Sequence, residues 1–248
     1  MRLGITLGAA AIAATSIVSS ASAVDLAFNN LYGVTGFSVD LAGSDISGTL
    51  AAGRLDYTVT GDTDPYFAVG QQISSFCSEI DQGVTGMAVP YDFYGVDEAE
   101  GIEAIPTPGT IGGPMGLAKA GFVSDLFTKY FVTAINGTET QAAAFQIALW
   151  EVVYEGPGDD GGIGTLDLDG GAFTVGGSGD GDREDAIDLA NQWLATLVDN
   201  GISDDMLGMG SATFQDQLTL LVVPIPGALA LGLIGMGGVA TMRRRLRG

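Results

Sequence analysis

Two consecutive segments set the fold class: LAKAGFVSDLFTKYFVTA at residues 117–134 and ETQAAAFQIALWEVVYE at residues 139–155. Both carry apolar residues at three- and four-residue spacing, and the one internal helix breaker is Gly121, near the start of the first segment. Asn136 and Gly137 separate the two segments as a turn. The sequence therefore predicts a pair of packed helices.

Alternating apolar and polar residues on both sides of this pair predict β-structure. The expected strands are residues 24–41, 45–61, 66–69, 73–80 and 217–223. Residues 87–117 are rich in Pro, Gly and acidic side chains, which predicts a long loop. Further on, residues 165–168 and 172–175 predict a short hairpin, and an apolar stripe predicts a third helix at about 183–198. We expect one α+β domain, an antiparallel β-sheet or sandwich with an inserted helical pair and a third helix.

The composition excludes several classes of function. The chain of 248 residues has 9 Lys and Arg against 30 Asp and Glu, and it has no His. A nucleic-acid binder is excluded because it needs a basic face. The absence of His excludes Ser-His-Asp and Cys-His nucleophile systems, His-ligated zinc and His-ligated haem. A single cysteine, Cys77, excludes an intramolecular disulfide, a Cys-rich zinc site and a Cys-ligated iron–sulfur cluster. We expect a protein without a cofactor that is not an enzyme.

Residues 1–23 have the pattern of a secretory signal peptide. Arg2 precedes an apolar run rich in small residues, and Ala21 and Ala23 form a small-x-small cleavage site. A first transmembrane helix is the alternative, but the run is short for a membrane span. We expect signal peptidase to cleave after Ala23.

The other end of the chain has three parts in sequence. They are the motif Val223, Pro224 and Pro226, the apolar residues 227–242, and the cluster Arg243, Arg244, Arg245 and Arg247. The apolar stretch barely spans a bilayer core of about 30 Å, and the arginines should keep the end of the chain in the cytoplasm. A generic tail anchor would share this plan but gives no reason for the prolines.

This three-part pattern resembles the PEP-CTERM sorting signal of Gram-negative bacteria, in its VPLPA-type variant, and departs from it at Ile225 and Gly227. The resemblance implies an intermediate held in the inner membrane through residues 227–242. It also implies cleavage by an exosortase near the prolines and delivery to the cell surface or the extracellular matrix. The exported body would then be residues 24–222, and the sorting signal residues 223–248.

Cys77 and Gln146 form a second pattern. Phe76-Cys77 lies in an expected strand, and 69 residues after Cys77 the chain reads Phe145-Gln146-Ile147-Ala148-Leu149-Trp150-Glu151. On a helix Gln146 and Trp150 share an apolar face, where an unpaired amide would be costly. Phe-Cys with Gln-x-Ala-Φ-Trp resembles the thioester domains of Gram-positive surface proteins. The whole layout, including Gln-Asp-Gln-Leu before the tail, resembles PEP-CTERM proteins that carry thioester-like domains.

The resemblance implies a thioester between Cys77 and Gln146, formed with loss of ammonia. Phe76, Glu79, Trp150 and Glu151 would support it, Trp150 as an apolar lid and the two glutamates in proton handling. An exposed thioester would capture a surface amine or hydroxyl, as a covalent adhesin does, whereas a buried one would staple the fold. Alternatively, Cys77 is a small core residue and Gln146 a satisfied buried amide. The protein would then be a passive matrix or exopolysaccharide-associated protein.

Two further patterns are weaker. Asp167, Asp169, Asp180 and Asp182 lie in Gly-rich stretches like fragments of calcium loops. They lack the full EF-hand spacing, and Asp182 is explained as the N-cap of the third helix. No metal site is therefore predicted. A secreted carbohydrate-active hydrolase with two catalytic carboxylates is the enzyme-class alternative.

Overall fold

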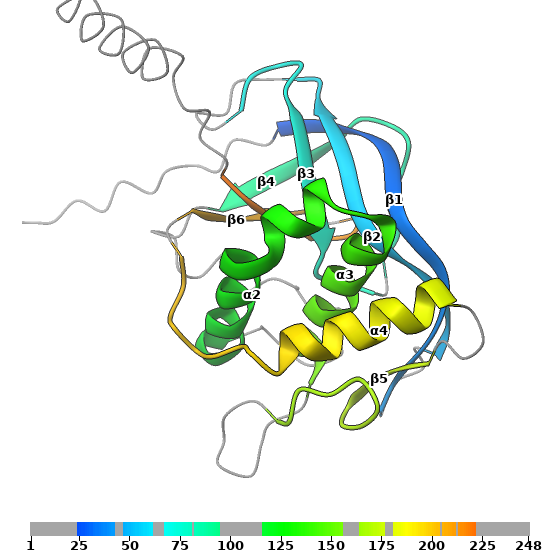
Figure 1. The fold of residues 1–248 in the computed structure, drawn as a ribbon. Coiled ribbons are helices and arrows are strands. Elements are labelled where there is room, and N and C mark those ends of the chain that lie inside the picture. Colours follow the sequence, from blue (N-terminus) through cyan, green and yellow to red (C-terminus); the bar gives the residue numbers. More distant parts are fainter. Residues whose placement is uncertain are drawn as a thin grey trace, which may run out of the picture.

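The structure is a computed structural model (Figure 1). It describes residues 24–42, 47–61, 67–80, 82–94, 116–155, 164–176, 181–203, 205–211 and 213–221. The predicted signal peptide, at residues 1–23, and the predicted sorting signal, at residues 223–248, lie outside them. Within the described part, no helix is both long enough and apolar enough to cross a bilayer.

All the described strands belong to one antiparallel sheet. They are β1 (Val24–Leu41), β2 (Ser47–Val59), β3 (Gln72–Cys77), β4 (Val89–Tyr94), β5 (Phe173–Gly176), β6 (Met206–Gly210) and β7 (Gln217–Leu220). Their order is β2-β3-β7-β6-β4-β1-β5, and β1 also pairs with β2. That extra pairing closes β1, β2, β3, β7, β6 and β4 into a ring, from which β5 projects along the far half of β1. Closure leaves these six strands with few free edges.

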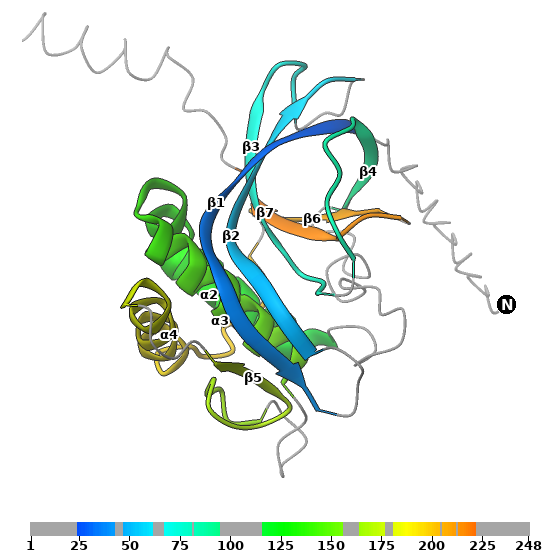
Figure 2. The ribbon, with the colours of Figure 1, turned by 90° about the vertical axis from the view of Figure 1, so that its right-hand side faces the viewer.

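The β1–β2 ribbon connects the strand ring to the helices. Val24–Leu26 pair with β4, whereas Ser38–Leu41, at the other end of β1, pair with β5. Two register shifts, between Phe28 and Asn30 and between Thr35 and Phe37, let the ribbon curve. Figure 2 shows this ribbon running between the helices on one side and β4 and β6 on the other.

Three helices cover one side of the ribbon: α2 (Gly116–Asn136), α3 (Glu139–Tyr154) and α4 (Gly181–Leu194). Thr138 and Gln141 form a capping box that fixes the start of α3. Every residue of α3 from Ala142 to Tyr154 is buried, because the helix packs against α2, α4, β1 and β2. A helix that is apolar all round is stable only in such a central position.

A cluster of aromatic rings joins the helices to the sheet. The ring of Phe76 at the end of β3 lies 4.3 Å from that of Phe145 on α3, and Phe145 lies 5.0 Å from Phe127 on α2. Phe131 completes the group, and all four side chains are fully buried or nearly so. Such contacts add to the free energy of burying the rings, so this cluster fixes the residue before Cys77.

The predicted α+β class and all three predicted helices are confirmed. The prediction of a loop over residues 87–117 is wrong in part, because β4 lies within it and pairs with β1 and β6, which are distant in sequence. Residues 67–70 form an irregular segment and a turn rather than the expected strand. Residues 173–176 form β5, which pairs with β1; of the predicted hairpin, a backbone hydrogen bond of 3.0 Å from the Val175 N–H to the Leu168 carbonyl is present. β6 was not predicted.

We expect Phe145→Ala to lower the free energy of unfolding by about 3–5 kcal/mol, since it empties a fully buried site among four aromatic rings. Urea unfolding monitored by circular dichroism measures the loss. Val132→Ala on α2 is the control: Val132 is 65% exposed, and its change should stay within about 0.5 kcal/mol. Equal losses for the two variants would contradict this assignment of the core.

Candidate functional site

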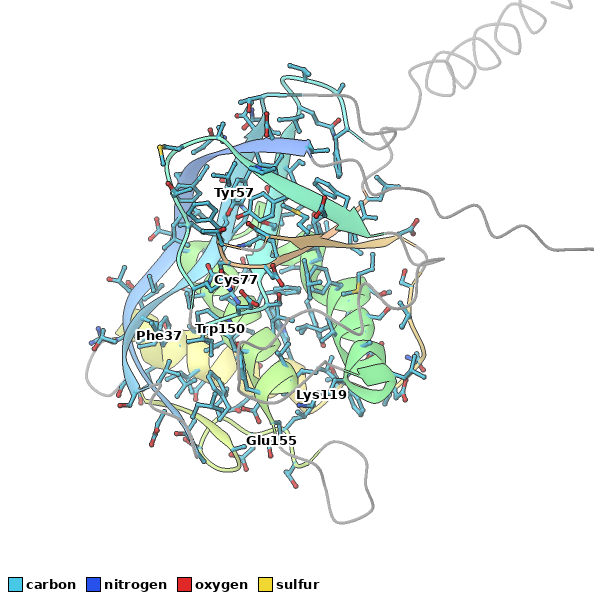
Figure 3. All side chains as sticks on the ribbon, turned by 180° about the vertical axis from the view of Figure 1, so that it is seen from behind. Phe37, Tyr57, Cys77, Lys119, Trp150 and Glu155 are labelled. Carbon is cyan, nitrogen blue, oxygen red and sulfur yellow. The ribbon has the colours of Figure 1, made fainter. Side chains whose placement is uncertain are left out.

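Cys77 is the last residue of β3, at the junction of the strand ring and the helices. It pairs across the sheet with Gln217 of β7, and it is 6% exposed. Burial raises the pKa of the Cys77 thiol to about 12; hydrogen bonding from Gln217 opposes this rise, and the charge of Glu79 adds to it. In the view of Figure 3, Cys77 lies between Tyr57 and Trp150.

Gln146 on α3 is fully buried and clamps the main chain of Cys77. The Cys77 N–H donates to Gln146 Oε1 at 2.9 Å, and Gln146 Nε2 donates to the Cys77 carbonyl at 2.8 Å. The two residues singled out in the sequence are therefore neighbours, and the amide is satisfied as its burial requires. The described contacts join Gln146 to the backbone of Cys77 rather than to its thiol.

The thiol meets a different carboxamide, that of Gln215. Cys77 Sγ lies 2.9 Å from Gln215 Oε1, and Gln215 Nε2 donates to the carbonyl of Glu79 at 2.5 Å. Gln217 also lies close to the thiol, but its amide accepts from Ser75 Oγ at 3.2 Å and donates to the main chain of Gln215 at 3.1 Å. We therefore assign the thiol contact to Gln215. Sequence reasoning did not select it; the available signal was the pair of glutamines around Asp216.

Glu79 lies beside this group. Its carboxylate is almost completely buried and accepts from the main-chain N–H of Asp216 at 3.2 Å. Glu151 does not join it: its carboxylate accepts from the N–H of Asp167 at 2.8 Å, in the segment that leads to β5. Of the two glutamates expected near the thiol, the described contacts bring only Glu79 there.

The face of α3 that carries Gln146 follows the chain from Cys77 to Ile80. Gln146 bonds Cys77, and the hydroxyl of Tyr154, two turns later, accepts from the Ile80 N–H at 3.0 Å. Trp150 lies between them on this face and is 2% exposed. The role of Trp150 as an apolar lid stays a prediction, since its burial and its place on this face are what the structure gives. Tyr154 was not selected from the sequence.

A pair of buried glutamates ends α3. Glu151 is fully buried and Glu155 nearly so, and the Glu155 carboxylate accepts from the Ala172 N–H at 3.0 Å. Burial, against the opposing hydrogen bond from the Asp167 N–H and with the charges of Glu155 and Asp167, raises the pKa of Glu151 to about 8. The pair fastens residues 167–172 to α3.

The calcium candidates do not come together among the described residues, where no three His, Cys, Asp or Glu side chains form a metal-binding group. Asp167 Oδ1 accepts from the N–H of Asp169 in a local turn. Asp182 lies in the first turn of α4, which begins at Gly181, rather than at its N-cap as expected. There its negative charge interacts favourably with the positive end of the helix dipole. Asp180 lies outside the described residues.

No protein-family model, no curated protein and no solved structure matches this chain. Its function is therefore inferred from the chemistry of the site itself.

We expect the stability of the protein to depend on the proton of Glu151. Its pKa rises from 4.5 to about 8 on folding. The folded chain binds this proton more tightly, so the contribution of Glu151 to stability is fully present below pH 4.5 and falls, by about 1.4 kcal/mol per pH unit, until the pH passes the folded pKa. The chain has no His, so few other side chains titrate in this range.

Glu151→Gln keeps the hydrogen bond to Asp167 and removes the charge, so its stability should change far less between pH 5.5 and 8.5. Urea unfolding at several pH values measures both proteins. Glu184→Gln, at an exposed position on α4, is the control and should keep the wild-type slope. Equal slopes for wild type and Glu151→Gln would contradict the prediction.

Proposed function

We propose that this chain is an exported, non-enzymatic surface or matrix protein whose body contains an internal thioester of Cys77. The thiol adds to a glutamine carboxamide, the C–N bond breaks, and ammonia leaves. The observation that carries the proposal is the buried contact of 2.9 Å between Cys77 Sγ and Gln215 Oε1.

The acyl partner that this contact favours is Gln215 rather than Gln146. The carbonyl carbon of Gln215 is only one C=O bond, about 1.2 Å, from the oxygen that the thiol touches. Both polar atoms of the Gln146 carboxamide are engaged with the main chain of Cys77. In this proposal Gln146 positions Cys77, and Gln215 supplies the acyl group.

The surroundings suit such a bond. Gln146 is fully buried, and Cys77 and Gln215 are 6% and 8% exposed. Fixed apposition of the reacting groups provides much of the rate of an intramolecular reaction, and exclusion of water protects the thioester from hydrolysis. The link would join residues 138 positions apart, which the chain-entropy model values at about 5 kcal/mol.

The two ends of the chain supply the proposed location. A signal peptide at residues 1–23 and a PEP-CTERM-like signal at residues 223–248 would take the body through the inner membrane to the surface of a Gram-negative bacterium. Signal peptidase and an exosortase would process it. An excess of acidic residues suits a soluble protein outside the cell.

Once outside, the thioester would acylate an amine or a hydroxyl on a surface or an exopolysaccharide. Because Cys77 and Gln215 are buried, this capture requires the site to open. In the closed protein the thioester therefore acts as a cross-link within the body, and it acts in adhesion only after the site opens.

A passive matrix protein without a thioester is the second candidate. Two observations favour it: the amide of Gln146 is satisfied without reaction, and burial raises the pKa of the Cys77 thiol to about 12. A thiol of this kind reacts slowly unless a base acts on it.

The mass of the folded protein separates the two candidates. We expect the wild type, purified under mild acid, to weigh about 17 Da less than its sequence, one ammonia lost. Cys77→Ala and Gln215→Ala should have their full masses. A wild type at full mass with a titratable thiol would overturn the thioester and leave the passive matrix protein.

Methylamine identifies the acyl donor without any substitution. The amine opens the thioester and remains on the glutamine as a methylamide, which peptide sequencing by mass spectrometry locates. We expect the label on Gln215. A label on Gln146 would instead support the pairing predicted from the sequence and refute the assignment to Gln215.

A further inference from the structure

We infer that Glu79 carries the proton in thioester formation, from Cys77 Sγ to Gln215 Nε2. The inference rests on the proposed function and deepens it by naming the group that makes the reaction feasible in a buried site.

The reaction needs a proton carrier. An S–C bond forms, the C–N bond of the carboxamide breaks, and the thiol proton ends on the departing nitrogen as ammonia, with no oxidation or reduction. The nitrogen is a poor leaving group until it is protonated. The thiol is neutral at pH 7, because burial raises its pKa to about 12. In a site closed to water, a side chain must move the proton.

Glu79 interacts with residues at both ends of this transfer. It follows Cys77 by two residues, just after the end of β3. Its main-chain carbonyl holds Gln215 Nε2 at 2.5 Å, and its carboxylate Oε2 accepts from the N–H of Asp216, the next residue, at 3.2 Å. The main chain of Glu79 therefore binds the nitrogen that leaves, and its carboxylate binds the main chain of the residue after Gln215.

The electrostatic environment agrees with this placement. Burial is the main cause of the raised pKa of the Cys77 thiol and of Tyr91, and the charge of Glu79 adds to both; the Tyr91 hydroxyl donates to the main-chain carbonyl of Gln215 at 3.3 Å. The carboxylate thus acts on groups that flank the reacting amide on both sides.

Tyr57 and Tyr91 also interact with the thiol, but burial raises the pKa of both phenols, so neither is a base near neutral pH. The other buried carboxylates bind main-chain N–H groups. Glu151 and Glu155 bind the main chain of residues 167–172. Asp216 Oδ1 accepts from the Ser211 N–H at 2.7 Å. Lys119 Nζ donates to the Val153 carbonyl on α3.

The test is the rate at which ammonia is lost during folding. The full chain is isolated unfolded in urea with a reductant, so that no thioester has formed, and is refolded by dilution. Samples quenched in acid give the fraction of the lighter species with time. We expect Glu79→Gln to slow its appearance by about 100-fold or more, the usual contribution of general acid–base catalysis. Glu151→Gln, a buried glutamate away from the thiol, is the matched control and should keep the wild-type rate.

A second readout separates proton transfer from packing. Formate supplied to Glu79→Ala should restore part of the rate, and Glu79→Asp should retain part of it, because both return a carboxylate to the site. If Glu79→Gln does not refold, as judged by near-ultraviolet circular dichroism, these two variants carry the test.

The outcomes distinguish the two proposals. A wild type that loses ammonia, together with Glu79 variants that lose it at the same rate, would overturn the role of Glu79 and leave the thioester standing. If Glu79→Gln is slow, but formate does not restore the rate of Glu79→Ala and Glu79→Asp is as slow as Glu79→Gln, the role in proton transfer is also overturned and a structural role is indicated. A wild type that never loses ammonia would overturn the proposed function, and the inference with it.

Discussion

The hydrogen bonds between the Gln146 carboxamide and the main chain of Cys77 join the two halves of the molecule. Gln146 belongs to the buried helix α3, and Cys77 ends a strand of the β ring. Loss of the amide would leave a buried N–H and a buried carbonyl unpaired, at a cost of about 1–3 kcal/mol for each. No apolar side chain can replace this clamp, because the groups that it satisfies belong to the backbone.

The position of the thiol follows from this clamp. The main chain of Cys77 is bound to α3 on one side, and the other side of the strand pairs with β7. There the main-chain N–H of Ser78 donates to the Asp216 carbonyl at 2.9 Å. The strand pairing then sets Gln215 and Gln217 around the sulfur. The helix α3 thus supplies one carboxamide, that of Gln146, and the chain at the start of β7 supplies two, those of Gln215 and Gln217, around Cys77 at the end of β3. Close placement of this kind makes an intramolecular acyl transfer plausible without a histidine.

The helices could be predicted from the sequence because their apolar periodicity is local. The need of Gln146 for a partner could also be predicted, and Cys77 is that partner, although through its backbone. Gln215 could not be, because it lies 138 residues from Cys77 and precedes β7 in an irregular segment, where no periodicity places its side chain. β4 and β6 were missed for the same reason, since their pairing is long-range. The misplacement of Glu151 was avoidable: five residues of helix turn the side chain about 140° from Gln146.

The unusual composition also shapes how charge is buried. The region between the ends of the chain has very few basic residues, so its buried acids cannot all be neutralised by ion pairs. Each of the five buried acids of the described part instead accepts a main-chain N–H: Glu79, Asp125, Glu151, Glu155 and Asp216. Asp125 adds an ion pair with Lys129. Main-chain donors hold a carboxylate in place without supplying a full positive charge, so a buried glutamate keeps a strong affinity for protons, as Glu151 does. A chain without histidine can in this way build groups that exchange protons near neutral pH from carboxylates alone.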